Sequence, residues 1–239
     1  MKFLFPLFIY CTIFSLNGQN LTGMELLEKT IAYHDPNGNW TTFNDSMTVV
    51  MTTPNQSPRT SHIKINLPSE YFKVTAIRDN KTTSYLLRKN TCIISADGKI
   101  LSDEEAKAKK MTCERSEFMK NYYTYLYGLP MKLKDPGTTI SEAVETKSFK
   151  GKDYLVLKAS YDKEVGTDVW YFYFNPKTYA MEVYQFFRTD EDGNAKLDTG
   201  EYILLKEEVI VNGIKMPKVR AWYYNKDDKY LGTDTLVEN

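Results

Sequence analysis

Short β-rich runs separated by turn residues dominate the chain after residue 45. Asp79-Asn80, Asp97-Gly98 and Asn212-Gly213 are typical of the tight turns that join antiparallel neighbours. In the first half of the chain the pattern predicts strands at 47–53, 60–67, 71–78, 81–88 and 91–96. Strands so closely spaced along the sequence predict a meander of hairpins.

The strands of the C-terminal half are apolar on both faces. At residues 170–174 one face carries Trp170, Phe172 and Phe174, while the other carries two tyrosines. A sheet with one solvated face would alternate apolar and polar residues, so these strands need two coverings. Helices can cover one face; more sheet, a partner or curling around a cavity would cover the other. Two packed layers with tyrosines at the rim remain the alternative interpretation.

Two capping boxes predict helix starts. Thr22 is followed three residues later by Glu25, and Ser102 by Glu105, the spacing at which the two side chains cap each other's backbone. The first helix is expected to end at residues 34–38, where a proline and a glycine stop it.

A third helix is predicted at residues 114–127, which lack glycine and proline. Its aromatic and apolar positions suggest one stripe along the helix, made of Phe118, Tyr122, Tyr125 and Leu126. Gly128 and Pro130 end it, and residues 129–138 are expected to form a structured loop.

The N-terminus predicts export. Residues 1–18 combine Lys2, an apolar run and a polar exit, which is typical of a cleaved signal peptide. The apolar run is shorter than the roughly 18 to 20 residues that span a bilayer, so no stable membrane insertion is expected. Residues 19–239 contain no linker or repeat and are expected to form a single domain in the periplasm or outside the cell.

The charge balance argues against nucleic acid as a partner. The chain has 31 Lys plus Arg and 31 Asp plus Glu, so no excess of positive charge is available for phosphates. Aromatic residues make up 14% of the chain and include 18 tyrosines, which suit half-buried sheets, cavities and interfaces. A soluble globular protein with a large aromatic surface to bury is therefore expected.

Cys92 and Cys113 are expected to form a disulfide, because they are the two cysteines that remain after signal cleavage and an exported chain meets oxidising conditions. The bridge would close a loop of about 22 residues and stabilise the fold by roughly 3 kcal/mol. A catalytic thiol is the alternative, with only His34 and His62 as partners.

Catalytic and metal signatures are few. The sequence has no Gly-x-Ser-x-Gly elbow and no phosphate-binding loop, and His34 beside Asp35 is interpreted as a helix-terminal cap whose imidazolium favours the carbonyl end. Two histidines and scattered carboxylates predict no transition metal and no cofactor.

Four segments resemble an uncharacterised family of exported Gram-negative envelope proteins, a domain of unknown function. They are His34-Asp35-Pro36 with Trp40, YYTYLYGLPMKLKDPGT at 122–138, WYFYFNPKTY at 170–179 and NGIKMPKVRAWYYN at 212–225. More distantly, the turn at 175–178 and the segment 211–217 resemble the periplasmic lipoprotein-carrier (LolA-like) fold. That resemblance implies an α+β fold: a curved, mostly antiparallel sheet of about eleven strands that forms an incomplete β-barrel, with helices covering its concave face.

The leading hypothesis is a non-catalytic binder or carrier of a hydrophobic small molecule or lipid, since relatives of the carrier type bind lipoprotein acyl chains. A lipoprotein or another envelope protein is a further possible partner. The residues expected to line the ligand site are Tyr122, Tyr125, Leu129, Met131, Trp170, Phe172, Tyr202 and Trp222. The alternatives are an envelope interaction module without a ligand and an enzyme that uses His34 and Asp35.

Overall fold

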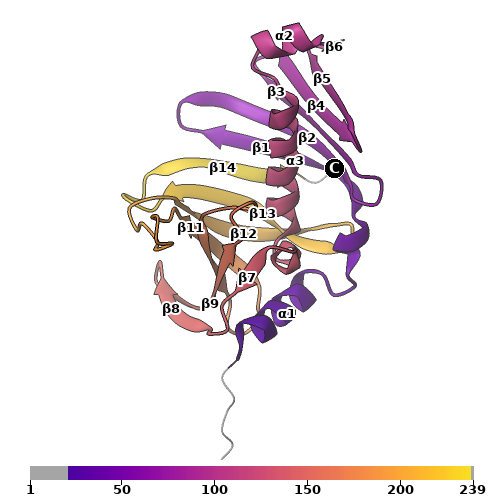
Figure 1. Cartoon of the computed structure of the whole chain (residues 1–239). Helices are drawn as coiled ribbons and strands as arrows, with labels where there is room; N and C mark the ends of the chain where they lie inside the picture. The colour runs from indigo at the N-terminus through magenta and orange to yellow at the C-terminus, as the bar shows by residue number, and fades with distance from the viewer. Residues whose placement is uncertain (1–20, 238–239) are drawn as a thin grey trace, which may run out of the picture.

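The computed structural model describes residues 21–237, so the signal predicted for residues 1–18 lies outside the described residues. Within this range the strands form one continuous antiparallel sheet (Figure 1). The fourteen strands found in the described range are β1 Asn44–Thr53, β2 Gln56–Asn66, β3 Tyr71–Arg78, β4 Lys81–Arg88, β5 Thr91–Ala96, β6 Lys99–Ile100, β7 Thr138–Ile140, β8 Glu145–Phe149, β9 Lys152–Tyr161, β10 Val169–Phe174, β11 Met181–Phe187, β12 Glu201–Val211, β13 Ile214–Tyr224 and β14 Tyr230–Val237.

The sheet is an incomplete barrel. Its strand order is β6-β5-β4-β3-β2-β1-β14-β13-β12-β11-β10-β9-β7, with β8 also paired to β9. The contact between β1 and β14, with Val49 opposite Leu236, joins the N-terminal hairpins to the C-terminal ones. Within residues 21–237 the two end strands, β6 and β7, do not pair with each other, so the barrel stays open. The predicted α+β class and open curved sheet are confirmed.

The strand count differs from the expected value of about eleven. Three strands of the described range are short: β6 has 2 residues, β7 has 3 and β8 has 5. These elements escape a pattern search because a period of two cannot be recognised in so few residues. The strands predicted for residues 71–96 match β3, β4 and β5 at both ends.

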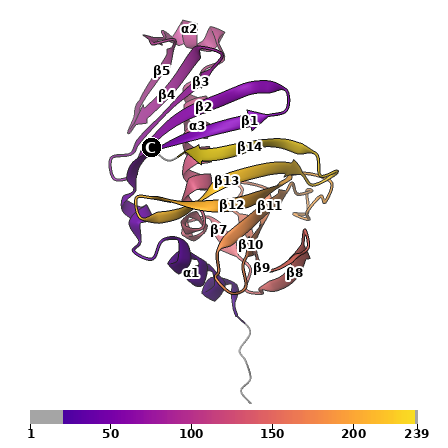
Figure 2. The ribbon, with the colours of Figure 1, turned by 180° about the vertical axis from the view of Figure 1, so that it is seen from behind.

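Three α-helices and two 3₁₀ turns accompany the sheet in the described range. They are α1 Gly23–His34, η1 Asn39–Thr42, α2 Asp103–Ala108, α3 Cys113–Gly128 and η2 Met131–Lys134. Helix α3 crosses one face of the sheet, while α1 lies at the end near β9 and β13 (Figure 1). Figure 2 shows the opposite face from behind, with the strands in front of α3. None of the helices in residues 21–237 combines the length and apolar character needed to cross a bilayer.

The helix starts are as the sequence predicts. The backbone N–H of Glu25 donates to Thr22 Oγ1 at 3.2 Å, and the Thr22 N–H donates to Glu25 Oε2 at 2.8 Å. The same reciprocal box forms between Ser102 and Glu105 at the start of α2. Both boxes satisfy backbone N–H groups that a helix start would otherwise leave unpaired.

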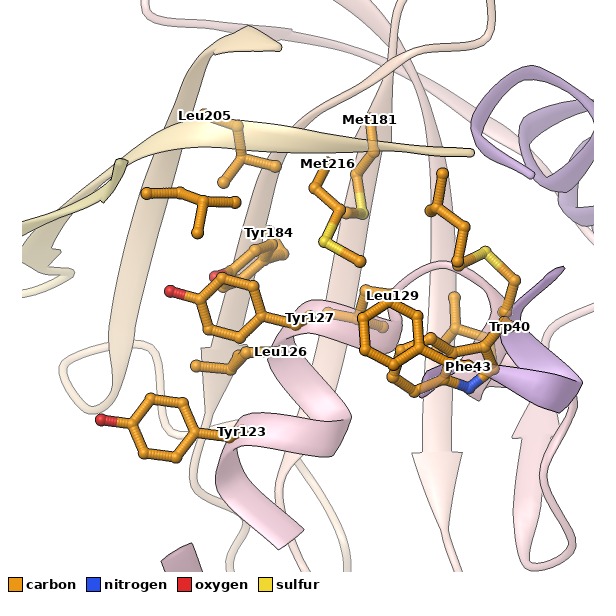
Figure 3. Close-up of a cluster of buried hydrophobic side chains, with 14 of the residues drawn as sticks. Trp40, Phe43, Tyr123, Leu126, Tyr127, Leu129, Met181, Tyr184, Leu205 and Met216 are labelled. Carbon is orange, nitrogen blue, oxygen red and sulfur yellow. The ribbon is translucent and has the colours of Figure 1, made fainter. Parts of the chain in front are cut away.

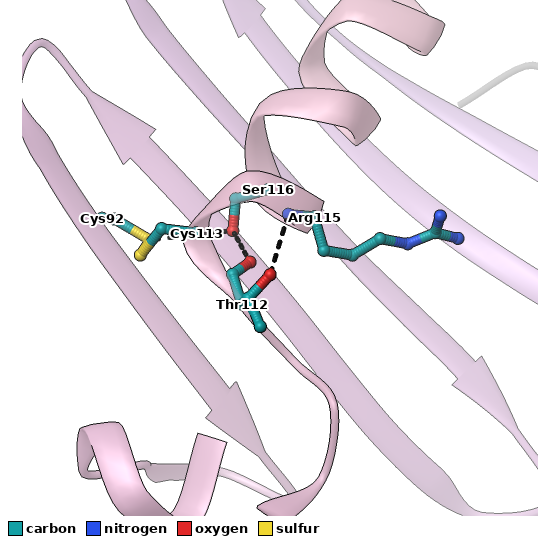
Figure 4. The surroundings of a disulfide bond; sticks show 5 residues. All are labelled: Cys92, Thr112, Cys113, Arg115 and Ser116. Atoms are coloured by element: carbon teal, nitrogen blue, oxygen red, sulfur yellow. Dashed lines mark hydrogen bonds between the residues drawn. A yellow bond between two sulfur atoms is a disulfide. The ribbon is translucent and has the colours of Figure 1, made fainter. Parts of the chain in front are cut away.

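The predicted disulfide links the start of α3 to the sheet. Cys92 on β5 is bonded to Cys113, the first residue of α3, and their Cα atoms lie 6.0 Å apart. Thr112 caps the same helix end, since its Oγ1 accepts a hydrogen bond of 3.2 Å from the Arg115 N–H (Figure 4). The disulfide and the Thr112 cap together fix the position of the start of α3 relative to β5.

Removing this disulfide should lower stability. The double variant C92S/C113S is expected to have a free energy of unfolding about 3 kcal/mol below that of the oxidised protein, because the bridge restricts the unfolded chain. Urea denaturation with and without reductant checks this. Reduced wild-type protein serves as the control and should match the double variant; equal stability of the oxidised and reduced forms would contradict the prediction.

The main core lies between the concave face of the sheet and α3. Figure 3 shows Tyr123, Leu126 and Tyr127 along one side of α3, with the Tyr127 ring beside Tyr184 of the sheet, and all four belong to the main core. Beneath them Phe172 and Phe174 are fully buried. The interior under α3 is therefore filled by side chains.

The convex face of β9–β12 is covered by the short strand β8 and by lysine side chains. Tyr154 and Tyr173 are buried there beside Phe149 of β8. The ammonium groups of three lysines lie over the rings of this face: Lys147 over Tyr171 at 4.8 Å, Lys150 over Tyr202 at 4.8 Å and Lys152 over Tyr154 at 5.5 Å. Lysine stems and one short strand thus shield the second aromatic face.

Candidate ligand-binding groove

A groove with a volume of about 660 Å³ lies beside α3 and is open to solvent. One wall is the side of α3 that carries Phe118, Tyr122 and Tyr125, and another is the 164–168 loop together with the adjoining ends of β9 and β10. Residues 132–138 form the third side. This cavity, here called the α3 groove, is lined on its apolar side by Phe118, Tyr122, Tyr125, Tyr161, Val165 and Trp170.

The aromatic rings of the α3 groove pack on one another. The Tyr125 ring meets Trp170 edge to face at a centroid distance of 5.4 Å, and Tyr161 at 6.2 Å. The Tyr125 and Tyr161 hydroxyls are hydrogen-bonded to each other. Phe118 stacks on Tyr122 at 6.2 Å. These contacts hold the rings in fixed positions, so much of the apolar surface of the groove is preformed.

Burial perturbs the hydroxyls of these tyrosines. It raises the pKa of Tyr161 to about 12, although the hydrogen bond from Tyr125 acts in the opposite direction. The pKa values of Tyr122 and Tyr125 are also raised, with burial again the main cause. All three side chains therefore stay neutral at physiological pH and present uncharged rings to the groove.

Arg220 fixes the end of α3 to the sheet. This side chain on β13 is 1% exposed, and its Nη1 donates to the Pro217 carbonyl at 2.9 Å. Its Nη2 donates to the Leu126 carbonyl at 3.4 Å, and the guanidinium lies 4.1 Å from the centroid of the Tyr127 ring. The Leu126 carbonyl belongs to the last turn of α3, where carbonyls lack helical partners and a cation is favoured. Arg220 therefore positions the helix that forms one wall of the groove.

Asp234 accompanies Arg220 inside the sheet. The two residues are directly opposite each other on β13 and β14, so their side chains share the concave face. Burial raises the pKa of the Asp234 carboxyl, while the positive charges of Arg220 and Arg59 oppose that rise. A buried set of charges thus lies behind α3, next to the tyrosines of the core.

The structure brings together three of the eight residues predicted for the ligand site: Tyr122, Tyr125 and Trp170 line the α3 groove. Four others pack into the core behind it, namely Leu129, Met131, Phe172 and Trp222. Tyr202 lies on the convex face, where its ring stacks on Tyr223 at 5.1 Å. The groove therefore lies beside α3 and does not follow the inner wall of the sheet.

The predicted stripe of α3 is divided between two sides of the helix. Leu126 packs on the sheet together with Met119, Tyr123 and Tyr127, which the stripe did not include. Phe118 is 53% exposed and lies with Tyr122 and Tyr125 at the groove. Because α3 carries aromatic residues on two sides, its periodicity alone could not distinguish the side facing the core from the side facing the groove.

Several groove residues were not foreseen. Tyr161 could have been, because it continues the two-residue period of Leu155, Leu157 and Ala159 along β9, all of which pack against the main core. Glu164 and Asp168 carry no such signal, since they belong to an irregular loop whose position depends on contacts distant in sequence.

His34 and Asp35 hold backbone segments together and do not line the α3 groove. His34 is fully buried; its Nε2 accepts a hydrogen bond of 2.9 Å from the Met181 N–H, and its Nδ1 is 2.7 Å from the Lys215 carbonyl. Nδ1 must therefore carry the proton of a neutral ring. The expected charged cap on α1 is thus corrected to a neutral link between β11 and β13. The Asp35 carboxylate accepts from the N–H groups of Asn39 and Trp40 at 2.8 and 2.9 Å.

Stability should fall on acidification because of His34. Burial lowers the pKa of His34, with opposing contributions from the Lys215 carbonyl and Glu208. Since the folded pKa lies below the unfolded value of about 6.5, its contribution is complete above pH 6.5 and is lost as the pH falls through the folded pKa. Urea denaturation between pH 7.5 and 5 should show this loss. In H34Q the pH dependence should be smaller, whereas H62Q, which changes a histidine on β2, should keep it; an unchanged profile in H34Q would contradict the assignment.

Metal ligands do not gather in the described part of the chain: within residues 21–237 no group of three or more His, Cys, Asp or Glu side chains is placed to hold an ion. The α3 groove offers rings, a few hydroxyls and separate charged groups instead. This arrangement suits binding of an organic molecule more than metal chemistry.

Comparison with known proteins identifies the family. The model of a family of unknown function, DUF6503, matches residues 2–239. The chain belongs to this family. Among curated proteins, no sequence matches this DUF6503 member.

Two solved structures are similar to this chain over most of its length. A LolA superfamily protein from Nitrosomonas europaea is similar over 91% of the DUF6503 chain and 92% of its own, with 11% identity and a TM-score of 0.50. A DUF1329 family protein from Desulfovibrio piger is similar over 90% and 91% of the two chains, with 8% identity and a TM-score of 0.48. At 11% identity, the similarity to the LolA superfamily protein establishes a LolA-like fold but no ligand or function.

Proposed function

We propose that this protein is a non-catalytic binder or carrier of a hydrophobic ligand, a lipid or an acyl chain, and that it acts in the periplasm or outside the cell. The observation that carries the proposal is the α3 groove, with about 660 Å³ of space lined by aromatic rings. Pockets for small organic ligands have volumes of about 300–1,000 Å³ and mostly apolar walls. The sequence of residues 1–18 supports the location.

The ligand would lie between α3 and the β9–β10 end of the sheet, with Tyr122, Tyr125 and Trp170 as its main contacts. Neighbouring rings hold the Trp170 side chain in place for this role, because it stacks on Phe186 at a centroid distance of 4.8 Å and on Phe172 at 6.0 Å. Two more exposed groups, Phe118 and Val165, lie at the opening and are 53% and 59% exposed. A ligand would remove their apolar surface from water, which favours binding.

Displacement of a neutral fluorescent probe tests the proposal. N-phenyl-1-naphthylamine should bind saturably to the protein and be displaced by dodecyl maltoside below its critical micelle concentration. The variant F118S/V165S should bind the probe and dodecyl maltoside about tenfold more weakly. Two apolar contacts are lost, at positions that do not support the core.

The matched control is I100S/I210S, which changes two apolar side chains that are 67% and 69% exposed and outside the α3 groove. This variant should bind as the wild type does. Absence of saturable probe binding would overturn the proposal, as would equal weakening in F118S/V165S and in the control.

A further inference from the structure

The charged groups of the α3 groove are not balanced. On the side of residues 132–138, Lys132 forms an ion pair with Asp135. On the facing loop, Glu164 and Asp168 line the groove, and neither forms a hydrogen bond or ion pair with another part of the chain that the structure describes. The positive charge of the groove is thus neutralised within the protein, while two carboxylates remain available.

Asp168 is the carboxylate closest in sequence to Trp170. Its side chain is partly buried, and burial raises the pKa of its carboxyl, while the positive charge of Arg188 opposes that rise. A carboxylate that has lost solvent without gaining a direct partner is stabilised by any cation that enters the groove.

The aromatic lining of the α3 groove also favours a positively charged ligand. Faces of tyrosine and tryptophan rings attract cations, and cages of such rings bind quaternary ammonium groups. The chain already uses one groove ring in this way, because the Arg115 guanidinium lies 4.8 Å from the centroid of Phe118. Tyr161 and Trp170 lie on the same side of the groove as the two free carboxylates.

We propose that the α3 groove selects amphiphiles with a cationic head group: an ammonium group next to Glu164 and Asp168, and its alkyl chain along the rings of Tyr122, Tyr125 and Trp170. This inference rests on the proposed function and specifies its ligand class. An anionic head group would be repelled by the two carboxylates, so carboxylate and sulfate amphiphiles are disfavoured.

Three amphiphiles with the same dodecyl chain test the inference: dodecyltrimethylammonium, dodecyl maltoside and dodecyl sulfate, each below its critical micelle concentration. Displacement of N-phenyl-1-naphthylamine gives the three affinities at low ionic strength. The cation is expected to bind at least tenfold more tightly than the maltoside and the sulfate most weakly. Added salt should reduce the difference, because it screens charges at a solvent-accessible site.

The variant E164Q/D168N should bring the affinity for the cation to that for the maltoside, and a far-ultraviolet circular dichroism spectrum like that of the wild type should show that the variant is folded. The control E191Q/D192N removes two exposed carboxylates outside the groove and should keep the preference. A cation that binds no better than the maltoside, or a preference that survives E164Q/D168N, overturns this inference alone. If none of the three binds, the proposed function fails with it.

Discussion

Replacing Arg220 by methionine is expected to lower the free energy of unfolding by about 3–5 kcal/mol, because the variant loses buried hydrogen bonds and one of the two positive charges that favour the ionised Asp234 carboxyl. Arg220 is 1% exposed and is bonded to the carbonyls of Pro217 and Leu126. Methionine preserves much of the volume of the side chain but donates no hydrogen bond, so the Leu126 carbonyl in the last turn of α3 would lose its partner and Asp234 one of its two neighbouring positive charges.

Urea denaturation at neutral pH measures the effect, and the double variant R220M/D234N separates its causes. Removing both charges should restore at least about 1 kcal/mol relative to R220M alone, because the double variant no longer buries the carboxylate whose charge Arg220 offsets. K206M, which changes an exposed residue on the neighbouring strand β12, should stay within about 0.5 kcal/mol of the wild type. A loss below about 1 kcal/mol in R220M would show that this buried arginine does not hold α3 to the sheet.

Replacing Phe172 by alanine should lower the free energy of unfolding by about 3–5 kcal/mol, the usual cost of removing a buried aromatic ring. Phe172 is fully buried on the concave face of β10, where the interior is filled and little space exists for collapse around a cavity. Thermal or urea denaturation monitored by circular dichroism provides the measurement.

The neighbouring residue supplies the control. Tyr171 points to the convex face, is partly exposed and packs beside Phe187 and under the Lys147 ammonium. Because much of its ring stays near water, Y171A should cost about 1 kcal/mol. Equal losses in F172A and Y171A would mean that the two faces of β10 are equally important for stability, contrary to the packing described above.

The sequence predicts the local elements well and the long-range ones poorly. The capping boxes at Thr22 and Ser102 depend on residues three positions apart, and the strands of residues 71–96 are bounded by tight turns, so local chemistry defines them. The pairing of β1 with β14 joins residues almost two hundred positions apart. No local pattern encodes such a contact, so the sequence does not predict how the two halves of the sheet are joined.

The groove was predictable only in part. Trp170 and Tyr125 were expected at a ligand site because the aromatic strands and helix needed a second covering. The sequence could not show that Phe172 and Trp222 would be covered by the core itself. Arg220 was missed although it shares its face of β13 with Met216 and Trp222, because a charge at an inward position is readily taken for a surface residue.

Contact between a bound alkyl chain and Trp170 is the most direct test of the account. The chain has three tryptophans, of which Trp40 is buried and Trp222 packs against the main core, whereas Trp170 lines the α3 groove. A dodecyl maltoside brominated along its alkyl chain quenches tryptophan fluorescence on contact. We expect saturable quenching that is retained in W222F and lost in W170F. Quenching that does not saturate, or that persists unchanged in W170F, would contradict ligand binding in the α3 groove.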